Sequence, residues 1–209
     1  MNINYHKLCL EEISKLEHPK KILLHSCCAP CSSYVITFLS NFFDITILYY
    51  NPNIYPKEEY NKRKEEQIKL INSLNTKNNL KYLDCDYENE VYNNAISGYE
   101  NCHEGGSRCN ICFNLRLEKT AKLAKENKFD YFCTTLTVSP HKNSKIINQI
   151  GEEISKKYNI KWLYSDFKKN EGYKQSIDLS KKYELYRQNY CGCIYSKKER
   201  KKQELTHIS

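Results

Sequence analysis

Residues 21–31 read Lys-Ile-Leu-Leu-His-Ser-Cys-Cys-Ala-Pro-Cys, and this stretch decides the fold class. The apolar run at residues 21–25 predicts a buried β-strand. Pro30 is well placed to begin a helix, because proline suits the first helical turn. Between strand and helix, Cys27 and Cys28 lie at a sharp turn. The stretch therefore predicts a strand followed directly by a helix, with two thiols at the carboxyl end of the strand.

The rest of the chain continues this alternation of short apolar strands and helices. We expect further strands at residues 45–50, 80–83, 130–136 and 160–164, and helices at residues 8–16, 30–39, 56–74, 110–127 and 145–158. A polar stretch at 87–107 predicts a short helix and a Gly-Gly turn, and the chain after residue 164 reads as helical, with a Cys-Gly-Cys interruption and a basic tail. The pattern predicts an α/β fold with a Rossmann-like parallel sheet of about five strands flanked by helices, and a cysteine-rich helical C-terminal part. Because no repeat, low-complexity segment or linker divides the chain, residues 1–209 are expected to form a single domain.

Composition narrows the classes of function. The chain has 209 residues, of which 28% are charged, and a formal net charge of +8. It lacks an apolar run long enough to span a membrane, and its first residues carry no secretion signal, so we expect a cytoplasmic protein without a membrane partner. The positive charge fits a polyanionic partner such as RNA or DNA, although a lysine-rich proteome would produce the same excess.

Seven of the eleven cysteines fall in three clusters that lie far apart in sequence. In a reducing compartment this number indicates metal binding or redox chemistry rather than a disulfide framework. Cys27 and Cys28 follow the first strand, at the sheet edge where parallel sheets bind ligands. Cys109 and Cys112 lie at a predicted helix start, where the positive helix end favours thiolate. Two such pairs supply four thiolates, which suit an iron–sulfur cluster or a structural zinc ion, and the spacing leaves that choice open.

The third cluster, Cys191-Gly192-Cys193, indicates a different use. Two cysteines separated by one glycine can close a strained, labile disulfide, and glycine supplies the backbone freedom that such a ring needs. A redox-active dithiol is one interpretation; two further metal ligands or plain buried thiols are the others. Cys31 is either a ligand or a neighbouring thiol. The roles of Cys102 and Cys133 stay open.

Several segments between about residues 20 and 196 match the motifs of one known family, in the same order along the chain. They are Leu-His-Ser-Cys-Cys-Ala-Pro-Cys-Ser at 24–32, Tyr-Asn-Pro-Asn-Ile-Tyr-Pro at 50–56 with the nearby Glu59, Tyr60, Arg63 and Lys64, Arg-Cys-x-x-Cys-Phe at 108–113 with Arg116 and Leu117, Thr-Thr-Leu-Thr-Val-Ser-Pro-His-Lys-Asn at 134–143, Asp-Phe-Lys-Lys at 166–169, and Leu-Tyr-Arg-Gln-x-Tyr-Cys-Gly-Cys at 185–193. With these motifs the chain resembles the QueH family of cobalamin-independent epoxyqueuosine reductases.

The resemblance implies a Rossmann-like fold related to the adenine-nucleotide alpha-hydrolase superfamily. It implies reduction of epoxyqueuosine to queuosine at the wobble position of a tRNA anticodon, the final step of tRNA queuosine biosynthesis. The implied cofactor is a [4Fe-4S] cluster on Cys27, Cys28, Cys109 and Cys112, without cobalamin, and the family also admits a further, mononuclear iron near the cluster. The pair Cys191 and Cys193 matches the redox-active cysteines of the family, which an external electron donor would serve.

The reaction fits this inventory, because removing an epoxide oxygen as water takes two electrons and two protons. A dithiol is the protein group that supplies two electrons, and an iron–sulfur centre accompanies it. Candidate proton donors are Tyr190, His141 and Asp166, although the last two also suit a loop hydrogen bond or a helix cap. The candidates for contacts with tRNA phosphates are basic residues, namely Arg63, Lys142, Lys168, Lys169, Arg187 and those of the tail, which would otherwise form a solvated helix face.

Two alternatives belong to other classes. An ATP-dependent PP-loop enzyme that modifies tRNA needs a Ser-Gly-Gly-x-Asp-Ser loop after the first strand to hold pyrophosphate. Residues 26–32 read Ser-Cys-Cys-Ala-Pro-Cys-Ser, without glycine, which disfavours that alternative. A non-catalytic, zinc-binding RNA-binding protein is the other, and metal analysis separates it from the reductase, since zinc without sulfide contradicts an iron–sulfur enzyme.

Overall fold

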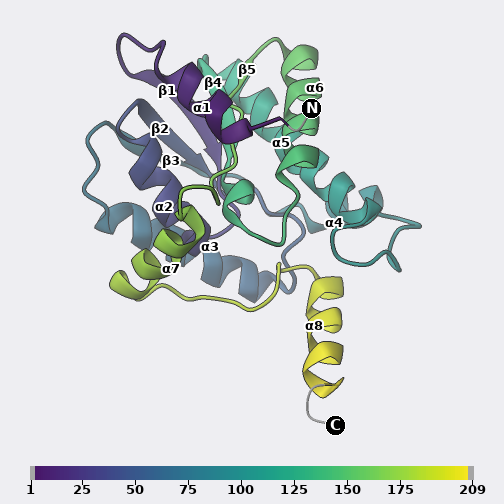
Figure 1. Ribbon diagram of the computed structural model, residues 1–209. Helices are drawn as coiled ribbons and strands as arrows, with labels where there is room; N and C mark the ends of the chain where they lie inside the picture. The colour runs from purple at the N-terminus through teal and green to yellow at the C-terminus, as the bar shows by residue number, and fades with distance from the viewer. Residues whose placement is uncertain (1–2, 207–209) are drawn as a thin grey trace.

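The computed structural model describes residues 3–206 and contains a five-stranded parallel sheet with helices on both faces (Figure 1). The strands lie in the order β3-β2-β1-β4-β5 and are β1 (Lys20–His25), β2 (Phe43–Leu48), β3 (Leu80–Leu83), β4 (Tyr131–Thr134) and β5 (Lys161–Trp162). The helices are α1 (Tyr5–Ile13), α2 (Ala29–Leu39), α3 (Lys57–Ser73), α4 (Asn89–Ala95), α5 (Ser107–Glu126), the 3-10 helix η1 (Thr135–Val138), α6 (Ser144–Tyr158), α7 (Gly172–Lys182) and α8 (Ile194–Thr206). The predicted α/β class and five-stranded sheet are confirmed.

The central strand β1 is apolar on both faces because helices cover both. Ile22 and Leu24 belong to a core cluster with side chains of α2, whereas Leu23, between them, belongs to a cluster with side chains of α5 and α6. All three are fully buried. Successive side chains of a strand point to opposite faces, so an uninterrupted apolar run marks a strand that is covered on both. On the first face α2 packs against α3 and α7; on the second, α5 packs against α6.

The order of the strands creates a crevice beside the carboxyl end of β1. This strand pairs with β2 on one side and with β4 on the other, and the chain fills the β2–β3 side before it crosses to β4. Parallel sheets bind their ligands outside the strand ends at such a switch point. The loop after β1 carries Cys27 and Cys28, and the segment after β4 begins with Thr135. The topology therefore brings these two segments to the same place.

Several expected elements differ in their bounds from those observed: the helix expected at 8–16 is α1 (Tyr5–Ile13), and the strand expected at 45–50 is β2 (Phe43–Leu48). The strand expected at 130–136 ends at Thr134, because the Thr134 hydroxyl accepts a hydrogen bond from the Leu136 amide and starts η1 (Thr135–Val138). The strand expected at 160–164 is reduced to the two residues of β5. The expected helical C-terminal part contains α7 and α8, but residues 183–193 between them are irregular.

The last helix, α8, projects from the body of the molecule and ends far from the sheet (Figure 1). Within α8, whose residues are all described, Ser196 alone is buried. Among residues 3–206, none of the helices combines the length and apolar character that crossing a bilayer requires.

We predict that Leu24→Ala lowers the free energy of unfolding by about 2–5 kcal/mol, because it removes a fully buried side chain from the central strand. Urea unfolding of the reduced protein, followed by circular dichroism, measures this loss. The matched control is Leu10→Ala in α1, where the side chain is 41% exposed and the expected change is within about 0.5 kcal/mol. Equal losses in the two variants would contradict the assignment of β1 as the core strand.

Candidate metal and redox site

The turn between β1 and α2 gathers three thiols. The sulfur atoms of Cys27, Cys28 and Cys31 all lie within 4.8 Å of one another, and those of Cys27 and Cys28 are 3.9 Å apart. Neighbouring residues in a strand point to opposite sides, but Cys28 has extended backbone directly before the first turn of α2, where strand alternation ends. The thiols of Cys27 and Cys28 therefore lie on the same side of the turn, together with that of Cys31.

Hydrogen bonds divide the charge unequally among these three thiols. The pKa of Cys28 is held well below its usual range because the thiols of Cys27 and Cys31 and the amide of Cys31 donate hydrogen bonds to its sulfur. The pKa of Cys31 is correspondingly well above its usual range, and that of Cys27 is also raised, chiefly by the hydrogen bond with Cys28. A thiolate at the start of α2 also gains from the positive helix end. Of the three thiols, Cys28 is therefore the one most readily ionised, and the three together are a suitable set of ligands for a soft metal.

Thr135 fixes the position of Cys27. The Cys27 amide donates to the Thr135 hydroxyl at 3.1 Å, and that hydroxyl lies 3.4 Å from the Cys27 sulfur. Thr135 is the first residue of η1, the turn that follows β4 directly. This turn therefore contacts the thiol cluster of Cys27, Cys28 and Cys31.

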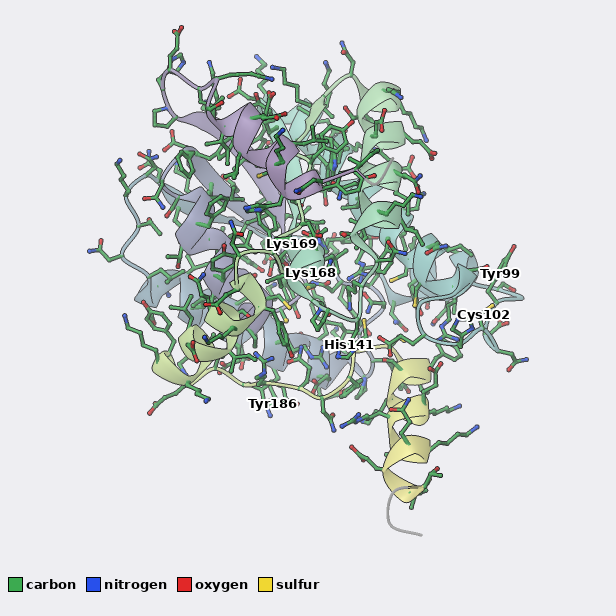
Figure 2. The ribbon with its side chains drawn as sticks, viewed as in Figure 1. Tyr99, Cys102, His141, Lys168, Lys169 and Tyr186 are labelled. Carbon is green, nitrogen blue, oxygen red and sulfur yellow. The ribbon has the colours of Figure 1, made fainter. Side chains whose placement is uncertain are left out.

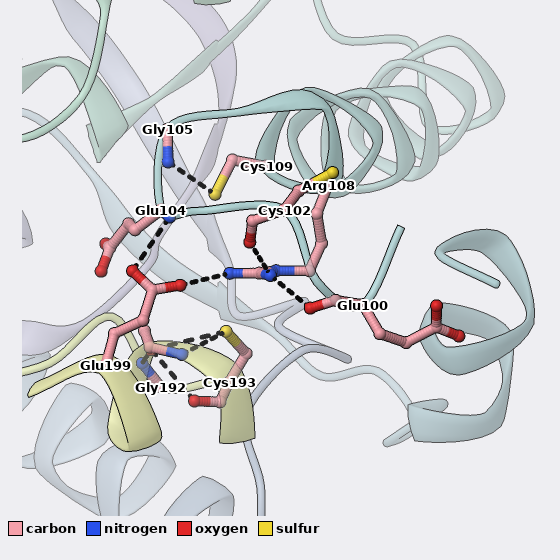
Figure 3. Close-up of polar contacts among 10 residues, drawn as sticks. Glu100, Cys102, Glu104, Gly105, Arg108, Cys109, Gly192, Cys193 and Glu199 are labelled. Carbon is pink, nitrogen blue, oxygen red and sulfur yellow. Dashed lines mark hydrogen bonds and ion pairs between the residues drawn. The ribbon is translucent and has the colours of Figure 1, made fainter. Parts of the chain in front are cut away.

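A second group of thiols lines a small cavity next to this turn. Cys109 and Cys112 come from the first two turns of α5, and Cys191 and Cys193 come from the segment before α8. Cys112 and Cys193 are buried in one cluster with Tyr92 and Ile96, and burial raises the pKa of Cys112 to about 12. The Cys109 sulfur accepts a hydrogen bond from the Gly105 amide at 3.2 Å (Figure 3). The structure thus places the predicted pair Cys109/Cys112 beside the predicted redox pair Cys191/Cys193.

Arg116 is a buried cation whose charge faces thiols. It is 1% exposed, and none of the ion pairs within residues 3–206 includes it. Its Nη1 donates to the Asn51 amide oxygen at 3.4 Å, and its buried Nη2 has no hydrogen-bond partner among the described residues. The charges that raise its pKa against the effect of burial are thiols, led by those of Cys112 and Cys191 and including Cys27.

Lys142 is a second cation in the same place. Its ammonium nitrogen donates to the Cys191 sulfur at 3.5 Å. Burial alone would lower the pKa of Lys142, but interaction with Cys191, Cys27 and Cys31 outweighs it, so the pKa is raised. A buried cation is costly unless negative charge compensates it. Lys142 and Arg116 therefore favour thiolates in both thiol groups, which is the state that binds metal.

The donor set fits an iron–sulfur cluster. Thiolates are the usual ligands of such clusters, and four of the thiols in these two groups are the predicted ligands Cys27, Cys28, Cys109 and Cys112. The orphaned Nη2 of Arg116 is a donor available to an inorganic sulfide or a thiolate. The structure describes all eleven cysteines, and each is a free thiol.

The segment Cys191-Gly192-Cys193 passes close to other backbone and side chains. The Gly192 carbonyl accepts from the Tyr55 amide at 3.0 Å, and the Cys191 carbonyl accepts from Arg63 Nη1 at 3.1 Å. Gly192 has φ +130°, and a Cβ atom there would lie 3.0 Å from both Arg63 Nη1 and Ile54 Cγ1. Glycine is required here both for the backbone conformation and for this close approach.

The predicted contacts to tRNA fall into two groups. Arg63 is 1% exposed and ion-paired with Glu59 at 2.7 Å, and Lys142 lies among the thiols, so these two cations belong to the site and not to an open surface. Figure 2 locates Lys168 and Lys169. Lys168 forms an ion pair with Asp166 at 2.6 Å, while Lys169 and Arg187 are exposed.

The predicted proton donors occupy different surroundings. Tyr190 precedes the Cys191 segment, and the Arg63 guanidinium lies 5.0 Å from its ring centre; burial raises its pKa, which keeps its hydroxyl protonated. His141 is exposed. Asp166 is buried, and its carboxylate is engaged by Lys168. Of the three, Tyr190 is the one next in sequence to the redox pair.

Sequence reasoning gave no role to three residues that shape this site: Arg116, Thr135 and Glu199, which pairs with Arg108. For Arg116 a signal existed. It lies four residues after Cys112 on one helix, and residues so spaced share a face. For Thr135 and Glu199 the contacts join segments distant in sequence, and local spacing contains no signal for them.

Comparisons with known proteins agree with the motifs. The family model described as "Epoxyqueuosine reductase QueH" matches residues 22–199. The chain is 44% identical to an epoxyqueuosine reductase QueH of Streptococcus pyogenes over 94% of this chain and 79% of that protein. It is 44% identical to one of Staphylococcus epidermidis, over 93% and 84% of the two chains, and 38% identical to one of Thermotoga maritima, over 86% and 92%. The chain belongs to the QueH family of epoxyqueuosine reductases.

Proposed function

We propose that this chain reduces epoxyqueuosine in tRNA to queuosine with an iron–sulfur cluster and a redox-active cysteine pair. The observation that carries the proposal is that seven thiols, the buried Arg116 and the partly buried Lys142 lie together at the switch point of the sheet. Membership of a family of oxidoreductases named for this reaction supports it.

The thiols would divide between two tasks. Cys27, Cys28, Cys109 and Cys112 would hold a [4Fe-4S] cluster, with Arg116 and Lys142 compensating its negative charge. When bound, such a cluster supplies one-electron transfer and a Lewis-acidic iron. Cys31 is a further thiol beside the cluster, and an additional mononuclear iron remains a family feature without ligands assigned in this chain.

Cys191 and Cys193 would supply the reducing equivalents. Oxidation of the two thiols to one disulfide releases two electrons and two protons. Cleavage of both C–O bonds of the epoxide consumes the same number, because the oxygen leaves as water and the two carbons become an alkene. An external reductant, of unassigned identity, would return the disulfide to the dithiol for the next turnover. The Lys142 ammonium donates to the Cys191 sulfur, and the charge of Arg116 acts on the same thiol, so these two cations would orient groups there.

Exposed basic residues would bind the tRNA. Lys169 and Arg187 are exposed, as are Lys198, Lys201 and Lys202 on α8. Phosphate contacts of this kind supply most of the sequence-independent affinity for nucleic acid. We also propose that residues 1–209 act as a single domain, in the cytoplasm where tRNA is modified. The zinc-protein alternative lacks a use for the pair Cys191/Cys193, and the PP-loop alternative lacks its glycine loop.

The main test is turnover of epoxyqueuosine-containing tRNA by protein purified without oxygen and assayed for iron and sulfide. We expect about four irons and four sulfides per chain, and queuosine formation with a low-potential reductant. Cys109→Ala should lose the cluster, whereas Cys191→Ser should keep cluster absorbance and lose multiple turnover. A cluster-replete protein that leaves the epoxide intact would refute the function, and zinc without sulfide would favour the non-catalytic alternative.

Arg116 gives a prediction on stability. Reconstitution of the cluster should raise the thermal midpoint of the wild type by at least about 4 °C more than that of Arg116→Met, since about 1 kcal/mol shifts a domain of this size by about 2–4 °C. The reason is that the wild-type guanidinium is uncompensated until thiolates form, whereas methionine carries no charge. Arg116→Lys, which keeps the charge, is the control and should recover most of the gain. The same gain in wild type and Arg116→Met would show that Arg116 does not compensate the cluster.

Binding of tRNA gives a third prediction. Replacing Lys198, Lys201 and Lys202 on α8 by glutamine should weaken binding several-fold for all tRNAs and reduce the slope of log affinity against log salt by about one unit per lost phosphate contact. Fluorescence anisotropy at salt concentrations from about 50 to about 200 mM measures both the affinity and the salt slope. The control replaces three other exposed lysines by glutamine: Lys122 and Lys125 near the C-terminal end of α5, and Lys128 just after it. It should change neither the affinity nor the salt slope. Equal effects would mean that net charge alone matters.

A further inference from the structure

Polar contacts in the first turns of α8 hold this helix in place. Ser196 is its buried residue, and its hydroxyl accepts from the Gly192 amide at 3.3 Å and lies 3.4 Å from the Cys193 sulfur. The rest of the helix projects away from the sheet (Figure 1). Because α8 begins one residue after Cys193, whatever fixes its first turns also fixes where Cys193 lies.

An ion pair ties these turns of α8 to the helix that carries Cys109 and Cys112. Arg108 Nη2 donates to Glu199 Oε1 at 3.1 Å, and Glu199 Oε2 accepts from the Glu104 amide at 3.0 Å (Figure 3). Each carboxylate oxygen of Glu199 therefore has a partner outside α8. Charge-assisted hydrogen bonds of this type are shorter and stronger than neutral ones.

Arg108 itself is held rigidly. It is 1% exposed, and its Nη1 donates to the carbonyls of Glu100 (2.8 Å) and Cys102. Its guanidinium also lies 4.6 Å from the ring centre of Tyr195 in α8. One guanidinium thus joins three segments: the loop before α5, the start of α5 next to Cys109, and α8. A fixed donor beside Cys109 is a suitable anchor for an element that must present Cys193 to Cys112.

The opposite side of the Cys191 segment has its own anchor. Arg63, paired with Glu59, donates to the Cys191 carbonyl, and the Tyr55 amide donates to Gly192. Contacts from α3 and its preceding loop therefore fix Cys191 and Gly192. On the Cys193 side, Glu199 is the acidic residue of α8 that reaches the α5 anchor.

We propose that Glu199 is a positioning residue for the redox pair: bound by Arg108 and the Glu104 amide, it holds α8 so that Cys193 stays buried against Cys112. This inference rests on the proposed function of Cys191 and Cys193. Glu199 acts through Arg108 and α8 and contacts neither substrate nor cluster ligand. Without it, α8 swings away on its exposed side, and Cys193 becomes accessible to solvent.

The test measures the reactivity of individual cysteines in the full-length, reduced protein. Alkylation by iodoacetamide is followed over time by mass spectrometry for the wild type, Glu199→Gln and Glu199→Ala. We expect the rate at Cys193, which is 6% exposed in the wild type, to rise at least about tenfold in Glu199→Ala, a factor equal to about 1.4 kcal/mol. Glu199→Gln should give a smaller rise, because its amide oxygen can still accept from Arg108.

The control on the same helix is Glu204→Gln, which removes an equal charge from an exposed residue paired with Arg200 and Asn189. Its rate at Cys193 should stay within about twofold of the wild type. Cys9 and Cys133 are fully buried in the core and report on unfolding. They should remain unreacted in every variant.

Two alkylation results would overturn the proposal. One is an unchanged rate at Cys193 in both Glu199 variants. The other is reaction of Cys9 and Cys133 in parallel with Cys193, which would make the ion pair a support of the whole fold and not of the redox pair.

Turnover separates this inference from the proposed function. In Glu199→Ala we expect slower multiple turnover with unchanged iron content. If the wild type fails to reduce epoxyqueuosine-tRNA, the proposed function fails while the alkylation result still decides the placement of Cys193. If the wild type is active and Glu199→Ala retains its multiple turnover, the positioning role is overturned.

Discussion

The charges of the buried Arg116 and the partly buried Lys142, together with the thiols around them, determine the properties of the rest of this site. Arg116 and Lys142 take part in none of the ion pairs formed within residues 3–206, and the groups that raise their pKa are thiols. An uncompensated cation in a protein interior is unfavourable, so the fold requires negative charge at this place. Cysteines supply that charge when they lose protons, as they do on binding metal. The cations and the thiolates therefore each reduce the free-energy cost of burying the other.

The parallel sheet is what allows so many segments to meet. β1 and β4 are neighbours, yet the chain runs through β2, β3 and α5 between them, so the loops after these two strands arrive at the crevice from separate parts of the sequence. Cys27 is joined to Thr135 across this crevice. The helix α5 then brings Cys109 and Cys112 to the same end of the sheet, and the irregular segment before α8 covers them.

Much of the fold follows from the periodicity of the sequence, and the exceptions have physical causes. The uninterrupted apolar run of β1 identified a strand covered on both faces. The predicted end of β4 was wrong because residues 134–136, two β-branched threonines and a leucine, continue to favour a strand, while a side-chain hydrogen bond of Thr134 turns the backbone into η1. The interruption expected at Cys191-Gly192-Cys193 is present, but residues 183–190 were wrongly expected to be helical; Glu184 there has a positive φ, which an α-helix does not accommodate. For the site, spacing identified the cysteine pairs and placed Cys31 near Cys27 and Cys28, but not that Cys193 lies beside Cys112, since a tertiary contact decides that grouping.

The irregular segment before α8 has a reason in the contacts that it makes. In a helix the carbonyls of Cys191 and Gly192 would be occupied by amides of the following turn. Here they accept instead from Arg63 and from the Tyr55 amide. The arginines that touch this part of the chain, Arg63 and Arg108, each have a glutamate partner, so their charge is balanced outside the cavity. The charge of Arg116 is not balanced in this way. Arginine thus serves two purposes here. The paired Arg63 and Arg108 fix the geometry of the redox segment, whereas Arg116, which has no carboxylate partner among the described residues, stabilises negative charge on the thiols.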